Sequence, residues 1–171
     1  MVVQVRTLRP DDAGDLFRLR RTALLDSPLA FSASPEDDLA SSEASTRELL
    51  RSSGDSVVIG AFVPALVGMI GLHRTRQRKT AHRVGIWGMF VLPQHRRMGI
   101  ASELLQAAIR HAHNLKDVES IHLSVTESAV AARRLYETAG FESWGIETGA
   151  IRFEGRAESE HHMRLVLAGP N

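Results

Sequence analysis

The sequence predicts a single α/β domain of the α+β kind, in which a mixed, mostly antiparallel sheet of about seven strands is flanked by about four helices. Stretches in which apolar and polar residues alternate are typical of strands, and stretches with apolar residues at helical spacing are typical of helices. They follow in the order strand, two helices, three strands, helix, strand, helix and two strands. Because a helix separates the fourth strand from the fifth, these two are expected to be parallel, joined by a right-handed crossover.

Single residues place the ends of several elements. Val3 and Val5 alternate with polar neighbours in the first strand, and Pro10 suits the first turn of the first helix. Ser128 is expected to cap the last helix through its side chain, and Gly140 to end it in a left-handed conformation. The other expected ranges are helices at about 35–51 and 100–113, strands at about 56–63, 66–73, 83–91 and 121–125, and strands at about 142–148 and 160–167 joined by a turn at Glu154 and Gly155.

The composition is that of an ordinary globular domain, with 43% hydrophobic and 24% charged residues among 171. A net charge of +1 leaves no electrostatic footprint for nucleic acid or an anionic membrane. Cysteine is absent, which excludes disulfides, thiolate metal sites and cysteine nucleophiles. The longest uncharged stretch, residues 57–72, is shorter than a membrane span, and the first ten residues do not resemble a signal peptide. We therefore expect one domain over residues 1–171, in the cytoplasm, with no nucleic-acid or membrane partner.

The most informative stretch is MFVLPQHRRMGIASELL, residues 89–105. A strand ends there, and a helix begins within a loop that contains Arg96, Gly99 and Ala101. Free backbone N–H groups and the positive end of the helix dipole meet at such a point, which suits a phosphate or pyrophosphate. Neither G-x-x-x-x-G-K-[ST] nor G-x-G-x-x-G is present, and a basic helix start without a ligand is the alternative.

Two blocks of the sequence resemble the GCN5-related N-acetyltransferases. Val91-Leu92-Pro93 followed by Arg96, Gly99 and Ala101 is similar to the acetyl-CoA loop of that family, (Arg/Gln)-x-x-Gly-x-(Gly/Ala) after a strand. Residues 132–141, ARRLYETAGF, resemble the family's A-x-x-L-Y-E-x-x-G-F helix. The resemblance implies the acyl-CoA N-acyltransferase fold, in which the fourth and fifth strands splay apart.

The resemblance also implies an activity, namely direct transfer of acetyl from acetyl-CoA to a primary amine on a small molecule or peptide. The acceptor would lie beside Phe31, and a main-chain N–H near Val91 would hold the thioester oxygen. Tyr136 would protonate the departing thiolate. The residues expected to bind acetyl-CoA are Met89, Phe90, Val91, Arg96, Arg97, Met98, Gly99, Ile100, Ala101, Ser102, Ala132 and Tyr136.

The base that would deprotonate the amine is harder to place, because residues 82–91 contain no Asp or Glu. Glu147 is the first candidate, followed by His82 and His122. The alternatives are an exposed strand-end acid for Glu147 and a core aromatic for Tyr136. A catalytically silent acyl-CoA-binding module stays open as a second function, and so does a homodimer. The eight histidines lack the spacing of a zinc site, so no metal is expected.

Overall fold

A computed structural model describes residues 2–51, 56–75 and 77–167 of the chain. Its centre is a seven-stranded sheet in the order β1-β2-β3-β4-β5-β7-β6. The strands are β1 (Gln4–Thr7), β2 (Val57–Val63), β3 (Ala65–Arg74), β4 (Arg83–Val91), β5 (Ser120–Thr126), β6 (Glu142–Phe153) and β7 (Arg156–Val166). The helices are α1 (Ala13–Asp26), α2 (Glu43–Arg51), α3 (Ile100–His113) and α4 (Val130–Thr138), with short 3-10 turns at Pro10–Asp12, Pro28–Ala30 and Pro93–His95.

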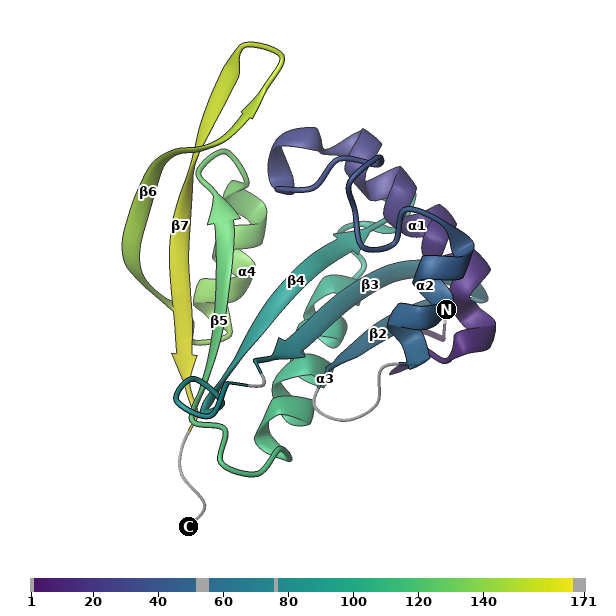
Figure 1. Cartoon of the computed structure of the whole chain (residues 1–171), viewed down its shortest axis with the longest axis horizontal. Helices are drawn as coiled ribbons and strands as arrows, with labels where there is room; N and C mark the ends of the chain where they lie inside the picture. Colours follow the sequence, from purple (N-terminus) through teal and green to yellow (C-terminus); the bar gives the residue numbers. More distant parts are fainter. Residues whose placement is uncertain (1, 52–55, 76, 168–171) are drawn as a thin grey trace.

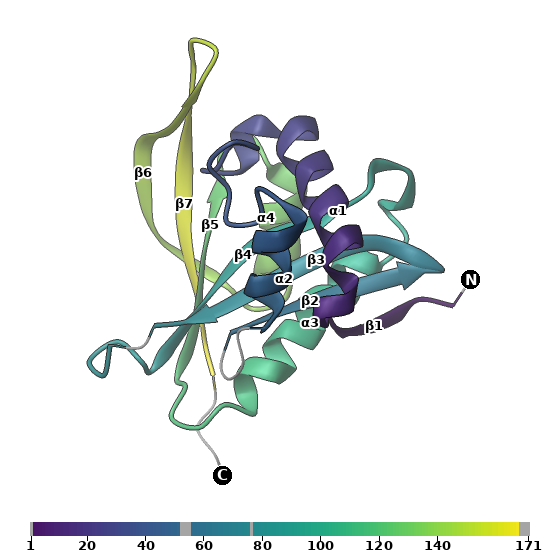
Figure 2. The same ribbon diagram turned by 45° about the vertical axis from the view of Figure 1, so that its right-hand side comes forward.

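The expected fold class is confirmed. Strands β4 and β5 pair in parallel, and the other paired strands of the described chain are antiparallel. Helices α1 and α2 cover one face of the sheet and α3 and α4 the other (Figures 1 and 2). The β6–β7 hairpin extends beyond the rest of the molecule in both views. None of the helices in the described part of the chain is long and apolar enough to span a membrane.

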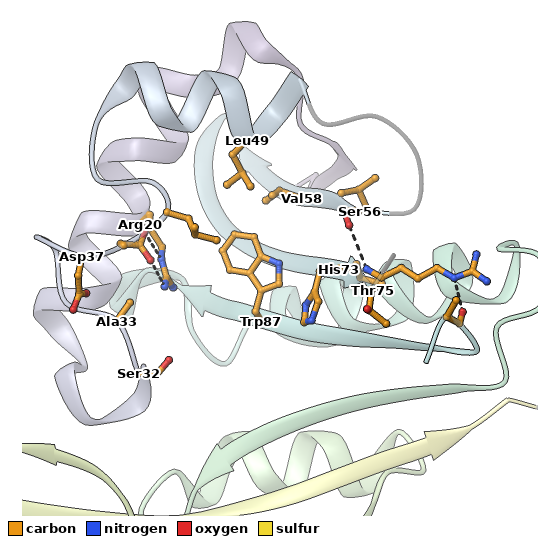
Figure 3. Close-up of a pocket in the computed structure, with 16 residues that line it drawn as sticks. Arg20, Ser32, Ala33, Asp37, Leu49, Ser56, Val58, His73, Thr75 and Trp87 are labelled. Atoms are coloured by element: carbon orange, nitrogen blue, oxygen red, sulfur yellow. Dashed lines mark hydrogen bonds and ion pairs between the residues drawn. The ribbon is translucent and has the colours of Figure 1, made fainter. Parts of the chain in front are cut away.

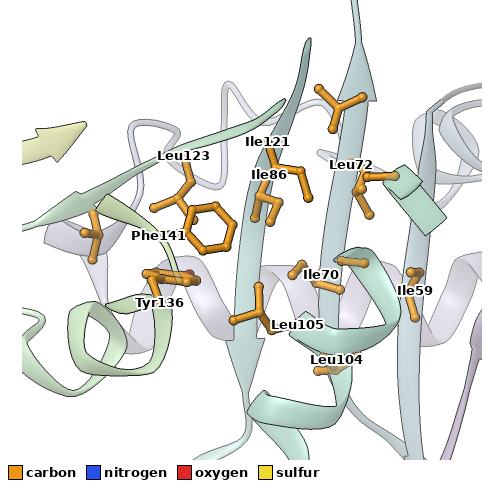
Figure 4. Close-up of a cluster of buried hydrophobic side chains, with 14 of the residues drawn as sticks. Ile59, Ile70, Leu72, Ile86, Leu104, Leu105, Ile121, Leu123, Tyr136 and Phe141 are labelled. Atoms are coloured by element: carbon orange, nitrogen blue, oxygen red, sulfur yellow. The ribbon is translucent and has the colours of Figure 1, made fainter. Parts of the chain in front are cut away.

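The larger core lies under α3 and α4 (Figure 4). Leu104, Leu105 and Ala108 form the buried stripe of α3 and pack on β2, β3 and β4, as their helical spacing predicts. Tyr136 from α4 lies edge-on to Phe141, with 5.9 Å between the ring centroids. This packing fixes the position of α3 and α4 relative to the two strands, β4 and β5, between which the candidate site lies.

Two expected element ends are wrong. The second helix begins at Glu43 rather than at about 35, because turns occupy the preceding segment, where the Asp37 carboxylate accepts a hydrogen bond from the Ser34 N–H at 2.6 Å. The last helix begins at Val130, and the Ser128 side chain does not cap it. Gly140 does follow that helix in a left-handed conformation, with φ of 94°. The last two strands are longer than expected, and they meet at the predicted turn, Glu154 and Gly155.

Candidate active site

Strands β4 and β5 pair over only a short distance. Their register is Arg83 with Ser120, Val84 with Ile121 and Gly85 with His122, and no further pair is found between them in the described chain. From Ile86 onward, the edge of β4 that faces β5 therefore has backbone groups without a partner strand. Such an edge can bind an extended molecule as if it were an added strand.

An irregularity in β4 lies beside this opening. Gly71 pairs with Trp87 and Met69 with Phe90, so β4 carries one more residue than β3 across this interval. Gly88 adopts φ of 66°, in the left-handed region where a side chain is disfavoured. Extra residues of this kind bend a strand and redirect its side chains. The bend coincides with the place where β4 leaves β5.

Three adjoining cavities follow the opening. The smallest, about 90 Å³, is lined by Phe31, Met89, Ser124, Ala132 and Tyr136 among others, and we call it the splay pocket. A cavity of about 1000 Å³ lies under α1 and α2 and contains Arg20, Asp38, His73 and Trp87 (Figure 3); we call it the α1-side cavity. A third, about 630 Å³, is lined by His73, Arg83, His122, Ser124, Trp144 and His162, and we call it the β5-side cavity.

These cavities share walls. Trp87 lines the splay pocket and the α1-side cavity, and Figure 3 shows its ring between Arg20 and His73. Ser124 lines both the splay pocket and the β5-side cavity. A narrow centre at the strand opening thus lies next to two wider spaces. The centre is small enough to orient a reacting group, and the wider spaces have the volume of typical ligand sites.

The loop after β4 presents backbone donors. Gly99, with φ of 81°, is the residue before α3, and Arg97 is also left-handed with φ of 61°. Glu103 is the first residue of α3 whose backbone N–H forms a hydrogen bond, which it donates to the Gly99 carbonyl at 3.1 Å. Among the described residues, the N–H groups from Gly99 to Ser102 have no hydrogen-bond acceptor. Such free amides at a helix start suit a phosphate oxygen.

The other predicted residues of this loop differ in burial. Ile100 is buried and anchors the helix start in the core, whereas Ala101 is half-buried. Met98 and Ser102 are exposed, as are Arg97 and Gly99. A Cβ at Gly99 would meet no atom of the described residues within 4 Å, so open space lies in front of the loop.

The Arg96 side chain does not point toward the free amides of the loop. Its Nε donates to the Val91 carbonyl at 2.9 Å, and its Nη2 forms an ion pair with Asp26 Oδ2 at 2.8 Å. The guanidinium also lies 5.4 Å from the centre of the Phe90 ring. The hydrogen bond from Arg96 is the main cause that lowers the pKa of Asp26. In this structure Arg96 therefore connects the loop to the end of α1.

Tyr136 lines the splay pocket. It is 5% exposed, and burial raises its pKa to about 12. Among the described residues no hydrogen bond to its hydroxyl is found.

Met89 and Ala132 line the same pocket and are half-buried, whereas Phe90 and Val91 are buried on opposite faces of the sheet. Phe31 closes the pocket from the α1 side, and its ring centre lies 4.9 Å from the Arg20 guanidinium.

The candidate bases are not together in one place. Glu147 lies on the exposed strand β6, outside the lining of the splay pocket, and its Oε2 is 3.1 Å from His162 Nε2. His122 lines the β5-side cavity, where burial, followed by the positive charges of Arg83, Arg164 and His82, lowers its pKa. His82 is exposed just before β4. None of these three side chains lines the splay pocket.

Sequence reasoning missed two features of this site. The first is the buried Arg20–Asp38 pair in the wall of the α1-side cavity, which joins α1 to the segment before α2. The second is Ser124 with His162 on neighbouring strands. The alternation of polar residues along 121–126 signalled a polar face of β5, but it did not indicate which strand would lie beside it. Among the described residues, no group of three or more His, Cys, Asp or Glu is placed to hold a metal ion.

Known proteins resemble both the sequence and the fold. An N-alpha-acetyltransferase of Sulfurisphaera tokodaii is 32% identical over 89 residues, which are 52% of each chain, so this chain spans about half the length of such curated relatives. The crystal structure of an acetyltransferase of the GNAT family from Streptococcus pneumoniae has a TM-score of 0.86 at 21% identity, covering 97% of this chain and 100% of that one. The Salmonella typhimurium protein yncA, solved with its cofactor acetyl-CoA, has a TM-score of 0.81 at 18% identity, covering 100% and 99%.

The sequence profile described as the acetyltransferase (GNAT) family matches residues 19–141, which include β4, the loop before α3, and the helix that carries Tyr136. The structural neighbours share the fold over nearly the whole chain. This chain belongs to the GNAT acetyltransferase family.

Proposed function

We propose that residues 1–171 act as one domain that transfers the acetyl group of acetyl-CoA directly to a primary amine while both substrates are bound. The observation that carries the proposal is the unpaired edge of β4, with Tyr136 on one side and the free amides of Gly99 to Ser102 at its end. Family membership and the resemblance of the fold to a protein solved with acetyl-CoA support it. The cytoplasmic location and the homodimer stay predictions.

In this proposal the chain holds acetyl-CoA in two places. The amides from Gly99 to Ser102 donate to the pyrophosphate, and the helix dipole of α3 favours its charge. The backbone of Met89, Phe90 and Val91 forms hydrogen bonds with the pantetheine arm along the free edge of β4. Ala132 is small enough to leave room beside that arm. Arg96 acts indirectly, because its bonds to Val91 and Asp26 fix the position of the loop.

Tyr136 is the proposed acid. Tyr136 lines the splay pocket, and its hydroxyl would protonate the thiolate that leaves when the amine attacks. Burial raises the pKa of Tyr136 to about 12. The same burial would raise the pKa of a thiol in the pocket, because both charged forms are anions that lose hydration. The two pKa values therefore stay close enough for the proton to cross as the carbon–sulfur bond breaks.

The acceptor is proposed to be an α-amino group, on a peptide or a small molecule. The name of the relative from Sulfurisphaera tokodaii, an N-alpha-acetyltransferase, supports this class. The α1-side cavity, with about 1000 Å³ beside Phe31 and Trp87, has room for the residues that follow such an amine. A silent acyl-CoA-binding module would hold the same cofactor without turnover, so release of free thiol with a panel of amines separates the two functions.

Binding of acetyl-CoA is tested by Gly99→Glu. A ligand at about 100 times its Kd stabilises the folded state by about 2.7 kcal/mol, so the wild-type melting temperature should rise clearly. The carboxylate introduced by this substitution would place a negative charge against the pyrophosphate and should abolish that rise. Differential scanning fluorimetry with and without acetyl-CoA measures both effects.

The matched control is Gly155→Glu. Gly155 has φ of 77°, close to that of Gly99, and a Cβ there would likewise meet nothing within 4 Å among the residues that the structure describes. It lies in the turn between β6 and β7, at the tip of the hairpin and away from the loop before α3 (Figure 2). The two variants thus share the backbone strain and the added charge. If both keep the rise with acetyl-CoA, the loop before α3 does not bind the cofactor.

A further inference from the structure

Three polar side chains on neighbouring strands form a continuous line into the site. Ser124 Oγ on β5 lies 3.1 Å from His162 Nδ1 on β7, and His162 Nε2 lies 3.1 Å from Glu147 Oε2 on β6. Ser124 and His162 are directly paired in the β5–β7 register, so both side chains stand on the same face of the sheet. The line runs from the splay pocket, which Ser124 lines together with Tyr136, to the exposed edge strand.

The donors and acceptors of this line can be assigned from chemistry. An ionised Glu147 only accepts, so His162 Nε2 carries the hydrogen in their bond. The Nδ1 atom of the neutral ring then has a free lone pair, and it accepts the Ser124 hydroxyl hydrogen. This leaves the lone pairs of Ser124 Oγ free to accept a proton at the wall of the splay pocket. No Asp or Glu of β4 can do so, because β4 contains none.

We propose that Ser124, His162 and Glu147 form a proton relay that removes the proton from the acceptor's ammonium group. The ammonium gives a proton to Ser124 Oγ as the Ser124 hydroxyl proton passes to His162 Nδ1. His162 becomes an imidazolium ion that Glu147 stabilises, and the amine becomes neutral and able to attack the thioester. His162 is thus the base, Ser124 the carrier of the proton, and Glu147 a positioning residue. The inference rests on the proposed acetyl transfer and deepens it.

Acidic and aromatic side chains lie close to the His162 ring. Glu147 faces it from β6. Glu160, two residues before His162 on β7, is the second acid nearby. The pKa of Glu160 is raised, mainly by burial; the charge of His162 lowers this pKa, and the charge of Glu147 raises it. The Trp144 ring on β6 lies 5.4 Å from the imidazole ring. Two carboxylates and an aromatic ring therefore lie beside the group that would become positive. Cationic and titratable groups face it as well: Arg83, His73 and His122 line the β5-side cavity with His162, and Arg164 follows it by two residues on the same face of β7.

The neighbouring residue on β7 provides an internal comparison. His161 Nδ1 lies 3.3 Å from Ser143 Oγ, on the opposite face of the sheet from His162. Its other nitrogen, Nε2, accepts from Arg133 Nη1 at 3.0 Å, so in the neutral ring Nδ1 carries the hydrogen. This second Ser–His pair has the reverse polarity, and it cannot accept a proton from its serine. His161→Gln and Ser143→Ala are therefore matched controls.

The test compares the pH dependence of kcat/KM for the wild type and the variants His162→Gln, Ser124→Ala and Glu147→Gln. The probes are acetyl-CoA with a peptide whose α-amine is free, and with an N-blocked peptide whose one amine is a lysine side chain. A lysine amine of pKa about 10.4 is neutral in about one molecule in 2,500 at pH 7. The comparison uses whichever peptide the wild type acetylates. At a pH well below the pKa of its amine, kcat/KM of His162→Gln and of Ser124→Ala should be about 10²-fold lower than that of the wild type. The loss should shrink to a few-fold above that pKa, where neutral amine is plentiful.

Three results bear on the relay. The controls His161→Gln and Ser143→Ala should stay within about two-fold of the wild type at every pH, as expected for groups outside proton transfer. If Ser124→Ala or His162→Gln keeps wild-type kcat/KM below the pKa of the amine, or loses the same factor at all pH values, the relay is overturned. Acetyl-CoA should still raise the melting temperature of both variants. A wild type that releases no thiol with any amine contradicts the proposed function instead.

Discussion

Replacing Asp38 with alanine is expected to lower the free energy of unfolding by about 3–5 kcal/mol, because the variant leaves a buried guanidinium without its partner. Arg20 is 5% and Asp38 8% exposed. Arg20 Nε and Nη2 donate to the two carboxylate oxygens at 3.1 and 2.8 Å. The third nitrogen, Nη1, is buried and has no hydrogen-bond partner in the part of the chain that the structure describes. Asp38 therefore provides all the hydrogen-bond acceptors that this arginine has among the described residues.

Urea unfolding measures the loss, and the Asp15–Arg18 pair is the control. That pair lies on the surface of α1 with 2.5 Å between Arg18 Nη2 and Asp15 Oδ1. Asp15→Ala should change the free energy of unfolding by no more than about 1 kcal/mol, as exposed ion pairs do. The double variant Arg20→Met/Asp38→Leu should recover most of the stability that Asp38→Ala loses, because it removes both buried charges. If Asp38→Ala costs no more than Asp15→Ala, the buried pair is not a structural element of the cavity wall.

Removing the hydroxyl of Tyr136 is expected to lower kcat by about 10²-fold, with the affinity for acetyl-CoA nearly unchanged. Tyr136→Phe keeps the ring that packs on Phe141 but has no proton to give to the departing sulfur. The pKa of about 12 predicts in addition that the wild-type rate does not fall through ionisation of Tyr136 up to about pH 10. Steady-state kinetics across that range, with melting curves in acetyl-CoA, measure both.

Phe141→Leu is the control variant, because it removes the aromatic packing on Tyr136 but keeps the proton of the Tyr136 hydroxyl. This substitution disturbs the same aromatic contact. It should lower the free energy of unfolding while changing kcat less than Tyr136→Phe does. Wild-type kcat in Tyr136→Phe would leave Tyr136 as a core aromatic, the alternative that the sequence left open.

The fold could be predicted where local pattern and tertiary packing agree. The helix over 100–113 is confirmed to the residue, because its apolar stripe faces the core and Gly99 provides its left-handed start. The pattern predicts helix for the segment before α2 as well, but there Asp37 and Asp38 bond to the Ser34 amide and to Arg20 instead of continuing a helix. The pairing of Asp38 with Arg20 is a long-range contact, and such contacts have no local signature.

The candidate site was harder to predict from the sequence than the fold, because it too depends on long-range contacts. The charge of Arg96 predicted an anion ligand, but Asp26 on α1 and the Val91 carbonyl bind that side chain. Ser124 and Glu147 are brought to the same histidine because β7 lies between β5 and β6, an order that the chain does not follow. The loop before α3 and Tyr136, by contrast, were predicted from contiguous motifs. The structure places that loop directly after the end of β4, and Tyr136 in the lining of the splay pocket.

Direct transfer in a ternary complex is tested most directly by initial rates of thiol release, with acetyl-CoA and an amine varied together. The amine panel includes peptides with free α-amino groups, N-blocked lysine peptides and small primary amines, and mass spectrometry identifies the acetylated product. Direct transfer requires thiol release that depends on the amine, one acetylated amine for each thiol, and reciprocal plots that intersect. Acetyl-CoA binding without thiol release on the whole panel, or parallel reciprocal plots from an acetylated enzyme, would contradict it.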